Sequence, residues 1–251
     1  MLSVPRTHER RAAATARRPA DRSLCMADDA IVIDTSPTPR CGVIWMHGLG
    51  ADGSDFEPIV PHLGLPPTLG VRFMFPHAPV QPVTVNGGMR MRAWYDIRTP
   101  DFTTREDAQG LAASAAALGG WIEAFAADGI PSERIVVAGF SQGGAIALHG
   151  GLAYAQPLAG ILALSTYLPL AEEFERHAHA ANRTTRIFMA HGSGDPVIPI
   201  ALAESSRSRL EALGYAVDFH TYPMAHSVAP EEIRDIGSFL KQRLASAESD
   251  A

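Results

Sequence analysis

The hydrophobic pattern alternates between short apolar runs and longer segments with apolar residues at helical spacing. The apolar runs predict buried strands at Ile31–Ile33, Cys41–Met46, Val71–Pro76, Arg134–Phe140, Leu158–Ser165, Arg186–Gly192 and Ala216–Pro223. The helical spacing predicts helices at Glu106–Ala127, Gln142–Tyr154, Leu170–Ala180, Ile200–Leu213 and Glu231–Leu244. Because the middle strands are apolar on both faces, the pattern predicts an α/β fold with a mostly parallel central sheet covered by helices on both faces.

The same pattern predicts one domain. Residues 26–251 contain no Pro/Gly/Ser-rich linker and no internal repeat, so we expect them to form a single α/β domain. The segment 76–101 is rich in Pro and Gly and has no clear period. Long irregular segments in compact domains usually have a function, so we expect this one to cover a site.

Residues 1–25 differ in composition from the rest of the chain. They carry six Arg against two acidic residues, a net charge of +4, and lack the apolar core of a secretory signal. Two interpretations remain open: an organelle transit peptide, or an over-extended start with Met26 as the true initiator. We favour the second because "MADDAIVID" leads directly into strand-like sequence. In either case residues 1–25 are an extension, disordered or mis-assigned, that lies outside the fold.

Composition excludes several classes of protein. The chain of 251 residues is 46% hydrophobic and 19% charged with a net charge of −6, which argues against a nucleic-acid-binding surface. Its two cysteines form no disulfide framework, so we expect a reducing, cytoplasmic environment. No apolar run is long enough to span a bilayer, so we expect no stable membrane insertion.

The stretch "VAGFSQGGAIAL" contains the strongest chemical motif. Gly139–Gly143 fits G-x-S-x-G and lies between a predicted strand and a predicted helix, the context in which Ser141 would be a nucleophile. On so sharp a turn, side chains two residues away would clash, which explains the glycines. The free N–H groups at the start of the helix could stabilise an oxyanion. The alternative is a Gly-rich turn with an incidental serine.

A nucleophilic serine needs a base and a group that orients the base. Asp195 and His226 follow Ser141 in the order Ser, acid, His, and each comes just after the end of a predicted strand. The carboxyl ends of parallel strands share one edge of a sheet, where ligands bind. Asp195 could instead be a turn residue and His226 a solvent-facing loop residue. His191 lies only a few residues before Asp195 and is interpreted as shaping that loop.

Two backbone N–H groups are the candidate oxyanion donors. One belongs to Gln142, directly after the serine, and the other to Leu49, in the Gly-rich loop after an early strand. That loop lacks the Gly-Lys-Ser/Thr of a phosphate-binding loop. The sequence also has no His-Glu-x-x-His and no Cys/His cluster, so we expect no metal and no cofactor.

Five motifs together resemble one family. They are "HGLGADGSDF", "RAWYDI", "GFSQGGAIAL", "HGSGDPVIP" and "HSV", in co-linear order within residues 30–245. They are similar to the carboxylesterase family that includes acyl-protein thioesterases and lysophospholipases. The resemblance implies an α/β-hydrolase fold without a large cap domain.

The resemblance also implies site residues. Ser141 would be the nucleophile, Asp195 the acid and His226 the base, with the N–H groups of Leu49 and Gln142 as the oxyanion hole. Trp94 would lie near the acyl pocket and bind substrate, although a core aromatic is an equal alternative.

Our sequence-based hypothesis is a serine hydrolase that cleaves small to medium carboxylic esters through an acyl-enzyme. The first alternative is an acyl-protein thioesterase or lysophospholipase acting on long-chain acyl groups. A peptidase is disfavoured because nothing suggests an added propeller or cap, and a non-catalytic binding module is the alternative from a different class. The partner would be a small-molecule ester or acyl thioester, and the sequence leaves open whether the chain forms a homodimer.

Overall fold

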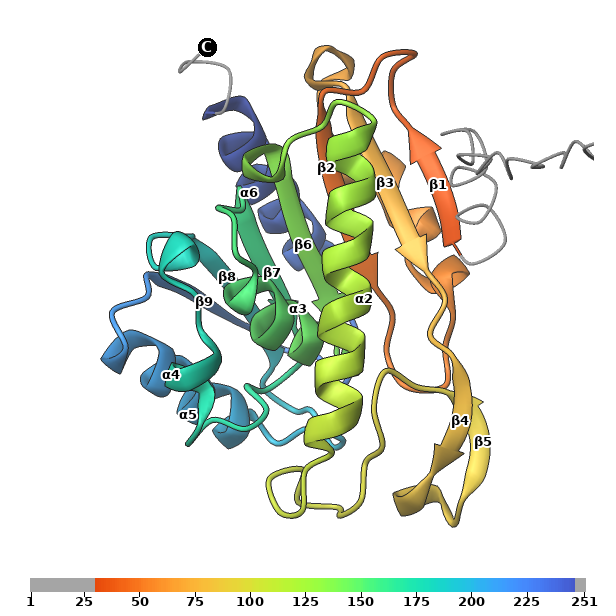
Figure 1. Cartoon of the computed structure of the whole chain (residues 1–251), viewed down its shortest axis with the longest axis vertical. Coiled ribbons are helices and arrows are strands. Elements are labelled where there is room, and N and C mark those ends of the chain that lie inside the picture. Colours follow the sequence, from red (N-terminus) through yellow and green to blue (C-terminus); the bar gives the residue numbers. More distant parts are fainter. Residues whose placement is uncertain (1–29, 247–251) are drawn as a thin grey trace, which may run out of the picture.

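The computed structural model describes residues 30–246, so the expectations for residues 1–25 lie outside the described residues. A seven-stranded sheet forms the centre of the molecule, in the order β1-β3-β2-β6-β7-β8-β9 (Figure 1). β1 pairs antiparallel with β3, and every other pairing in this sheet is parallel. The strands are β1 (Ala30–Asp34), β2 (Cys41–Met46), β3 (Val71–Pro76), β6 (Ile135–Phe140), β7 (Gly160–Leu164), β8 (Ile187–Gly192) and β9 (Val217–Tyr222).

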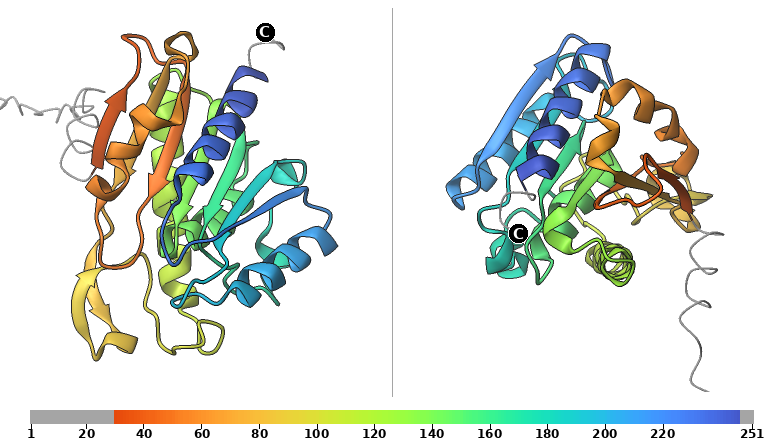
Figure 2. Two further views of the ribbon diagram at one scale, coloured as in Figure 1. Left: turned by 180° about the vertical axis from the view of Figure 1, so that it is seen from behind. Right: turned by 90° about the horizontal axis from the view of Figure 1, so that it is seen from above.

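Helices cover both faces of the sheet (Figure 2). One face is covered by α2 (Ala108–Ala127), α3 (Gln142–Ala153), α4 (Phe174–His177) and α5 (Ile200–Ala212), and the other by α6 (Pro230–Ser246) with the 3₁₀ helix Glu57–Leu63. Further short 3₁₀ helices are Gly53–Asp55, Pro67–Leu69, Thr84–Asn86, Ser132–Arg134 and Ala180–Asn182. The predicted α/β architecture is therefore confirmed.

The two faces of β2 explain why the strand is apolar throughout. Val43 and Trp45 belong to the core cluster under α6, whereas Ile44 and Met46 belong to the cluster under α2 and α3. All four side chains are at most 1% exposed. Alternate residues of a strand point to opposite faces, so a strand buried on both sides has no polar positions.

Two predictions about secondary structure were wrong. The predicted helix Leu170–Ala180 contains only the four-residue α4, because Leu170 has a positive φ of 49° and Ala178 is extended, with a ψ of 132°. The segment 76–101 is not irregular throughout: it forms a hairpin of β4 (Val80–Val83) and β5 (Met89–Arg92), which continues beyond the end of β3 (Figure 1). Pro82 and the polar residues of this hairpin conceal the strand pattern.

One helix in the described part of the chain, α2, reaches the length and hydropathy of a membrane span. From the sequence we expect no such segment. In the fold, Leu111, Leu118, Ile122 and Phe125 of α2 are at most 1% exposed and pack in the core. Alanines raise the mean hydropathy of the helix, whereas these four large side chains form its buried face.

Candidate active site

Ser141 lies on a sharp turn between β6 and α3. Its φ of 54° and ψ of −117° lie in a region that side-chain-bearing residues rarely adopt, at a cost of about 1–3 kcal/mol. Two hydrogen bonds to neighbouring segments hold the turn: the Ser141 N–H donates to the Leu164 carbonyl (2.8 Å), and the Thr166 hydroxyl donates to the Ser141 carbonyl (2.6 Å). The strained conformation is thus fixed by β7 and by the residues that follow it.

The glycines of the motif are required by close backbone contacts. A Cβ atom on Gly139 would lie 2.2 Å from the backbone of Gly143, and one on Gly143 would lie 2.3 Å from the Met46 carbonyl oxygen. Real Cβ atoms essentially never approach a backbone atom this closely. The steric reason given for the glycines from sequence is therefore confirmed.

Asp195 and His226 are hydrogen-bonded to each other, as their positions after strand ends predict. The Asp195 Oδ2 atom lies 2.7 Å from His226 Nδ1. Asp195 Oδ1 accepts the backbone N–H groups of Val197 (2.8 Å) and Ile198 (2.9 Å). The carboxylate is fully shielded from solvent, so the loop, and not water, orients its oxygens.

His226 lies beside the turn that carries Ser141. Its ring centroid is 4.7 Å from that of Phe140, the residue before Ser141, and its side chain keeps 16% exposure. Within residues 30–246, no hydrogen bond joins the Ser141 hydroxyl to His226. Hydrogen bonds of catalytic groups are often long in the absence of substrate and tighten when it binds.

The loop after β2, which carries Leu49, runs along the turn that carries Ser141. A Cβ atom on Gly48 would lie 3.4 Å from the Cβ of Ser141, so the two segments are in contact. His47 fixes the start of the loop: its Nε2 accepts the Ala78 N–H (3.0 Å), and its Nδ1 lies 2.7 Å from the Gly48 carbonyl. Burial lowers the pKa of His47, which favours the neutral ring that this bonding requires.

Trp94 is buried beneath this loop. It is 3% exposed, its indole N–H donates to the His47 carbonyl (2.8 Å), and its ring makes an edge contact with Trp121 at 5.9 Å. Of its two proposed roles, this environment favours that of a core aromatic. The backbone of Trp94 also contacts the side chain of Gln142, a contact that no sequence signal indicated.

His191 contacts the loop that carries Asp195. It is fully buried, and its Nε2 lies 2.9 Å from the Ile198 carbonyl and 3.5 Å from Asp195 Oδ2. Burial lowers the pKa of His191, so the ring is neutral and Nε2 donates to the carbonyl. This agrees with the prediction that His191 shapes the loop.

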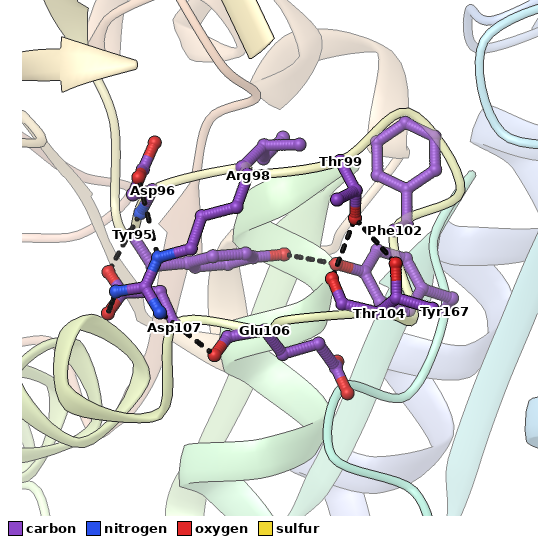
Figure 3. A pocket seen from close by; sticks show the side chains of 10 residues that line it. Tyr95, Asp96, Arg98, Thr99, Phe102, Thr104, Glu106, Asp107 and Tyr167 are labelled. Carbon is purple, nitrogen blue, oxygen red and sulfur yellow. Dashed lines mark hydrogen bonds and ion pairs between the residues drawn. The ribbon is translucent and has the colours of Figure 1, made fainter. Parts of the chain in front are cut away.

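Two other features bear on ligand binding. A pocket of about 10 Å³ lies between the segment 95–107 and Tyr167 (Figure 3), and that volume accommodates about one water-sized sphere and not an acyl chain. Among residues 30–246, no group of three or more His, Cys, Asp or Glu side chains could hold a metal ion.

Comparison with known proteins identifies the family. The phospholipase/carboxylesterase family model matches residues 27–244. The chain is 41% identical over 220 residues to acyl-protein thioesterase 1 of Mycosarcoma maydis, covering 81% of this chain and 91% of that protein. It is 43% identical over 211 residues to acyl-protein thioesterase 1 of Neurospora crassa, covering 80% and 86%.

Solved structures of similar proteins support the same family. Arabidopsis thaliana SOBER1 has a TM-score of 0.77 at 29% identity, covering 82% of this chain and 99% of that one. Zea mays acyl-protein thioesterase 2 has a TM-score of 0.76 at 27% identity, covering 86% and 98%. The chain therefore belongs to the phospholipase/carboxylesterase family, has an α/β-hydrolase fold and is a hydrolase of esters or thioesters.

Proposed function

We propose that this hydrolase is an acyl-protein thioesterase, which removes long-chain acyl groups from thioester linkages through a Ser-His-Asp triad. The names of the relatives favour this alternative over the small-ester hydrolase that we took as the main hypothesis from sequence. The observation that carries the proposal is the 2.7 Å bond between Asp195 and His226 beside the strained turn of Ser141.

Each residue has a specific role in this mechanism. His226 removes the proton of the Ser141 hydroxyl, and the oxygen attacks the thioester carbonyl. Asp195 holds the imidazole in the required tautomer and stabilises its charged form. The N–H groups of Leu49 and Gln142 stabilise the tetrahedral oxyanion, a contribution of about 3–4 kcal/mol for each donor. The thiol leaves with the proton from His226, and a water molecule then hydrolyses the acyl-enzyme by the same steps.

The remaining expectations belong to the same proposal. The enzyme needs no metal or cofactor, because the triad and the two N–H groups supply every step of the chemistry. Residues 26–251 act as one domain. We assign the enzyme to the cytoplasm, where cysteine thiols such as that of the buried Cys41 stay reduced.

The test uses Ser141→Ala, with Ser193→Ala as its control because Ser193 is an exposed serine in the Asp195 loop. We expect Ser141→Ala to abolish both thioester hydrolysis and labelling by a fluorophosphonate, and Ser193→Ala to keep both. Full activity of Ser141→Ala would refute the proposed nucleophile.

A series of substrates tests the acyl specificity. It would run from p-nitrophenyl acetate through p-nitrophenyl octanoate to an S-palmitoylated peptide. We expect kcat/KM to be highest for the long-chain thioester. If acetate is the best substrate and the palmitoylated peptide is not cleaved, the small-ester hypothesis replaces the thioesterase.

A further inference from the structure

We infer that the side chain of Gln142 is a positioning group that ties the two halves of the oxyanion site together. This inference rests on the proposed function, in which the backbone N–H groups of Gln142 and Leu49 bind the oxyanion. The role of the backbone N–H of Gln142 and the role of its carboxamide are separate. The carboxamide bonds to a different segment of the chain, at residues 94 and 95.

The carboxamide makes two hydrogen bonds to adjacent residues. Its Oε1 accepts the backbone N–H of Trp94 (2.8 Å), and its Nε2 donates to the carbonyl of Tyr95 (2.6 Å). Gln142 is only 2% exposed, so water does not compete for these partners. Two bonds from one planar group fix both the position and the orientation of the segment relative to the first residue of α3.

A third bond extends the connection to the other predicted donor. The Trp94 indole N–H donates to the carbonyl of His47 at 2.8 Å. That carbonyl belongs to the peptide that joins His47 to Gly48, one residue before Leu49. Trp94 and His47 are 3% and 1% exposed. A buried chain of three hydrogen bonds therefore links the start of α3 to the loop after β2.

The linking segment is itself anchored at its far end, as Figure 3 shows. The Asp96 N–H donates to Asp107 Oδ2 (3.0 Å), and the Arg98 guanidinium bonds to Asp107 Oδ1 (2.8 Å). The Tyr95 hydroxyl points toward the Tyr167 hydroxyl, 3.1 Å away. Because the segment is held on that side, Gln142 bonds to a fixed frame and not to a mobile loop.

The chemistry of the side chain explains why glutamine is suited to this position. A carboxamide presents one acceptor and two donors, and so matches the N–H and C=O of neighbouring residues. Glutamate would place a second acceptor against the Tyr95 carbonyl, and methionine would leave both backbone groups unpaired. An oxyanion hole depends on donors that are already in place before charge develops. A displacement of either N–H would therefore weaken binding of the transition state more than binding of the substrate.

The test compares Gln142→Met, which keeps the volume but removes both bonds, with Ser114→Ala. The Ser114 hydroxyl also bonds to the same segment, at the Trp94 carbonyl, but it comes from α2 and has no link to the turn. The measurements are kcat and KM for a p-nitrophenyl ester, the melting temperature, and the inhibition constant of an alkyl trifluoromethyl ketone. The Ser141 hydroxyl adds to the carbonyl carbon of this ketone, the proton passes to His226, and the resulting oxyanion occupies the oxyanion site.

We expect Gln142→Met to lower kcat about 10- to 100-fold, somewhat less than the loss of a whole oxyanion donor, with KM changed by less than about threefold. The ketone should bind more weakly by a similar factor. Ser114→Ala should lower the melting temperature yet keep kcat, KM and inhibition within about twofold. Trp94→Phe removes the third bond, so it should also lower kcat, and Gln142→Met/Trp94→Phe should lose less than the product of the two single effects.

Three outcomes would overturn the inference. The first is a Gln142→Met enzyme that is less stable but keeps the parent kcat and ketone affinity. The second is a double variant in which the two effects multiply. The third applies if Gln142→Met does not fold: a Trp94→Phe enzyme that keeps the parent ketone affinity would then overturn the inference. Failure of the proposed function would be distinct, because Ser141→Ala would then keep its activity whatever Gln142 does.

Discussion

Replacing Asp195 by asparagine separates the catalytic role that we propose for this carboxylate from its structural role. Oδ1 accepts two backbone N–H groups, whereas Oδ2 accepts the His226 Nδ1–H at 2.7 Å. In Asp195→Asn, the amide oxygen can keep both backbone bonds, but the NH₂ group then faces His226. Two donors cannot bond to each other, so the imidazole must carry its proton on Nε2. That tautomer cannot accept a proton from Ser141.

The magnitudes follow from these contacts. Loss of the correct tautomer lowers kcat by about 10⁴-fold in Ser-His-Asp enzymes, equivalent to about 5 kcal/mol of activation free energy. The unfolding free energy of Asp195→Asn should stay within about 1 kcal/mol of the parent, because both backbone bonds persist. Asp195→Ala should instead lose about 2–4 kcal/mol, since the buried N–H of Ile198 is left unpaired while that of the exposed Val197 can reach water.

The assay is ester or thioester turnover together with urea unfolding on both variants. We expect both to be nearly inactive and only Asp195→Ala to be destabilised. If Asp195→Asn retains more than about a tenth of the parent kcat, the tautomer argument fails. If Asp195→Asn unfolds as readily as Asp195→Ala, the bonds at Oδ1 do not stabilise the loop.

Two further predictions concern stability, each measured by urea unfolding. Gly143→Ala should lower the unfolding free energy by about 3 kcal/mol or more, because its Cβ would lie 2.3 Å from a backbone oxygen. Gly120→Ala should raise the unfolding free energy by about 0.5–1 kcal/mol, because a Cβ there would meet nothing within 4 Å. Equal effects of the two substitutions would contradict the steric argument. Burial raises the pKa of Glu232 from 4.5 to about 7, so the native state holds this proton more tightly than the unfolded chain and stability falls as pH rises between these values. The unfolding free energy of Glu232→Gln, relative to that of the parent, should therefore rise by up to about 3 kcal/mol between pH 4.5 and 8. A difference between the two proteins that does not change with pH would refute this.

The sheet could be predicted because burial on both faces leaves a direct signal in the sequence. A strand such as Cys41–Met46 has no polar position, and the turns after it contain Gly or Pro. The β4–β5 hairpin left no such signal, because Val80 and Met89 are 50% and 64% exposed and Val83 is the one residue of these two strands that is buried. Where an element is not buried, its sequence carries no period, and prediction fails for that reason.

The bond between Asp195 and His226 was predictable for a topological reason. β8 and β9 are neighbours and parallel, so the loops after them leave the sheet at the same edge. Sequence order alone therefore places the two side chains near each other once the strands are recognised. Ser141 follows β6, two strands away from β8, and reaches the same edge by the same rule.

The contacts of the Gln142 side chain could not be predicted, because its partners are backbone atoms. The N–H of residue 94 and the carbonyl of residue 95 exist whatever side chains those positions carry. The sequence therefore shows the glutamine but not its partners. From sequence alone, one polar residue at the start of a helix cannot be distinguished from a surface residue. It follows that Tyr95→Phe, which keeps the backbone carbonyl, should preserve the bond to Gln142 and with it kcat. A loss of kcat comparable to that of Gln142→Met would mean that the Tyr95 hydroxyl, and not the backbone, maintains the connection.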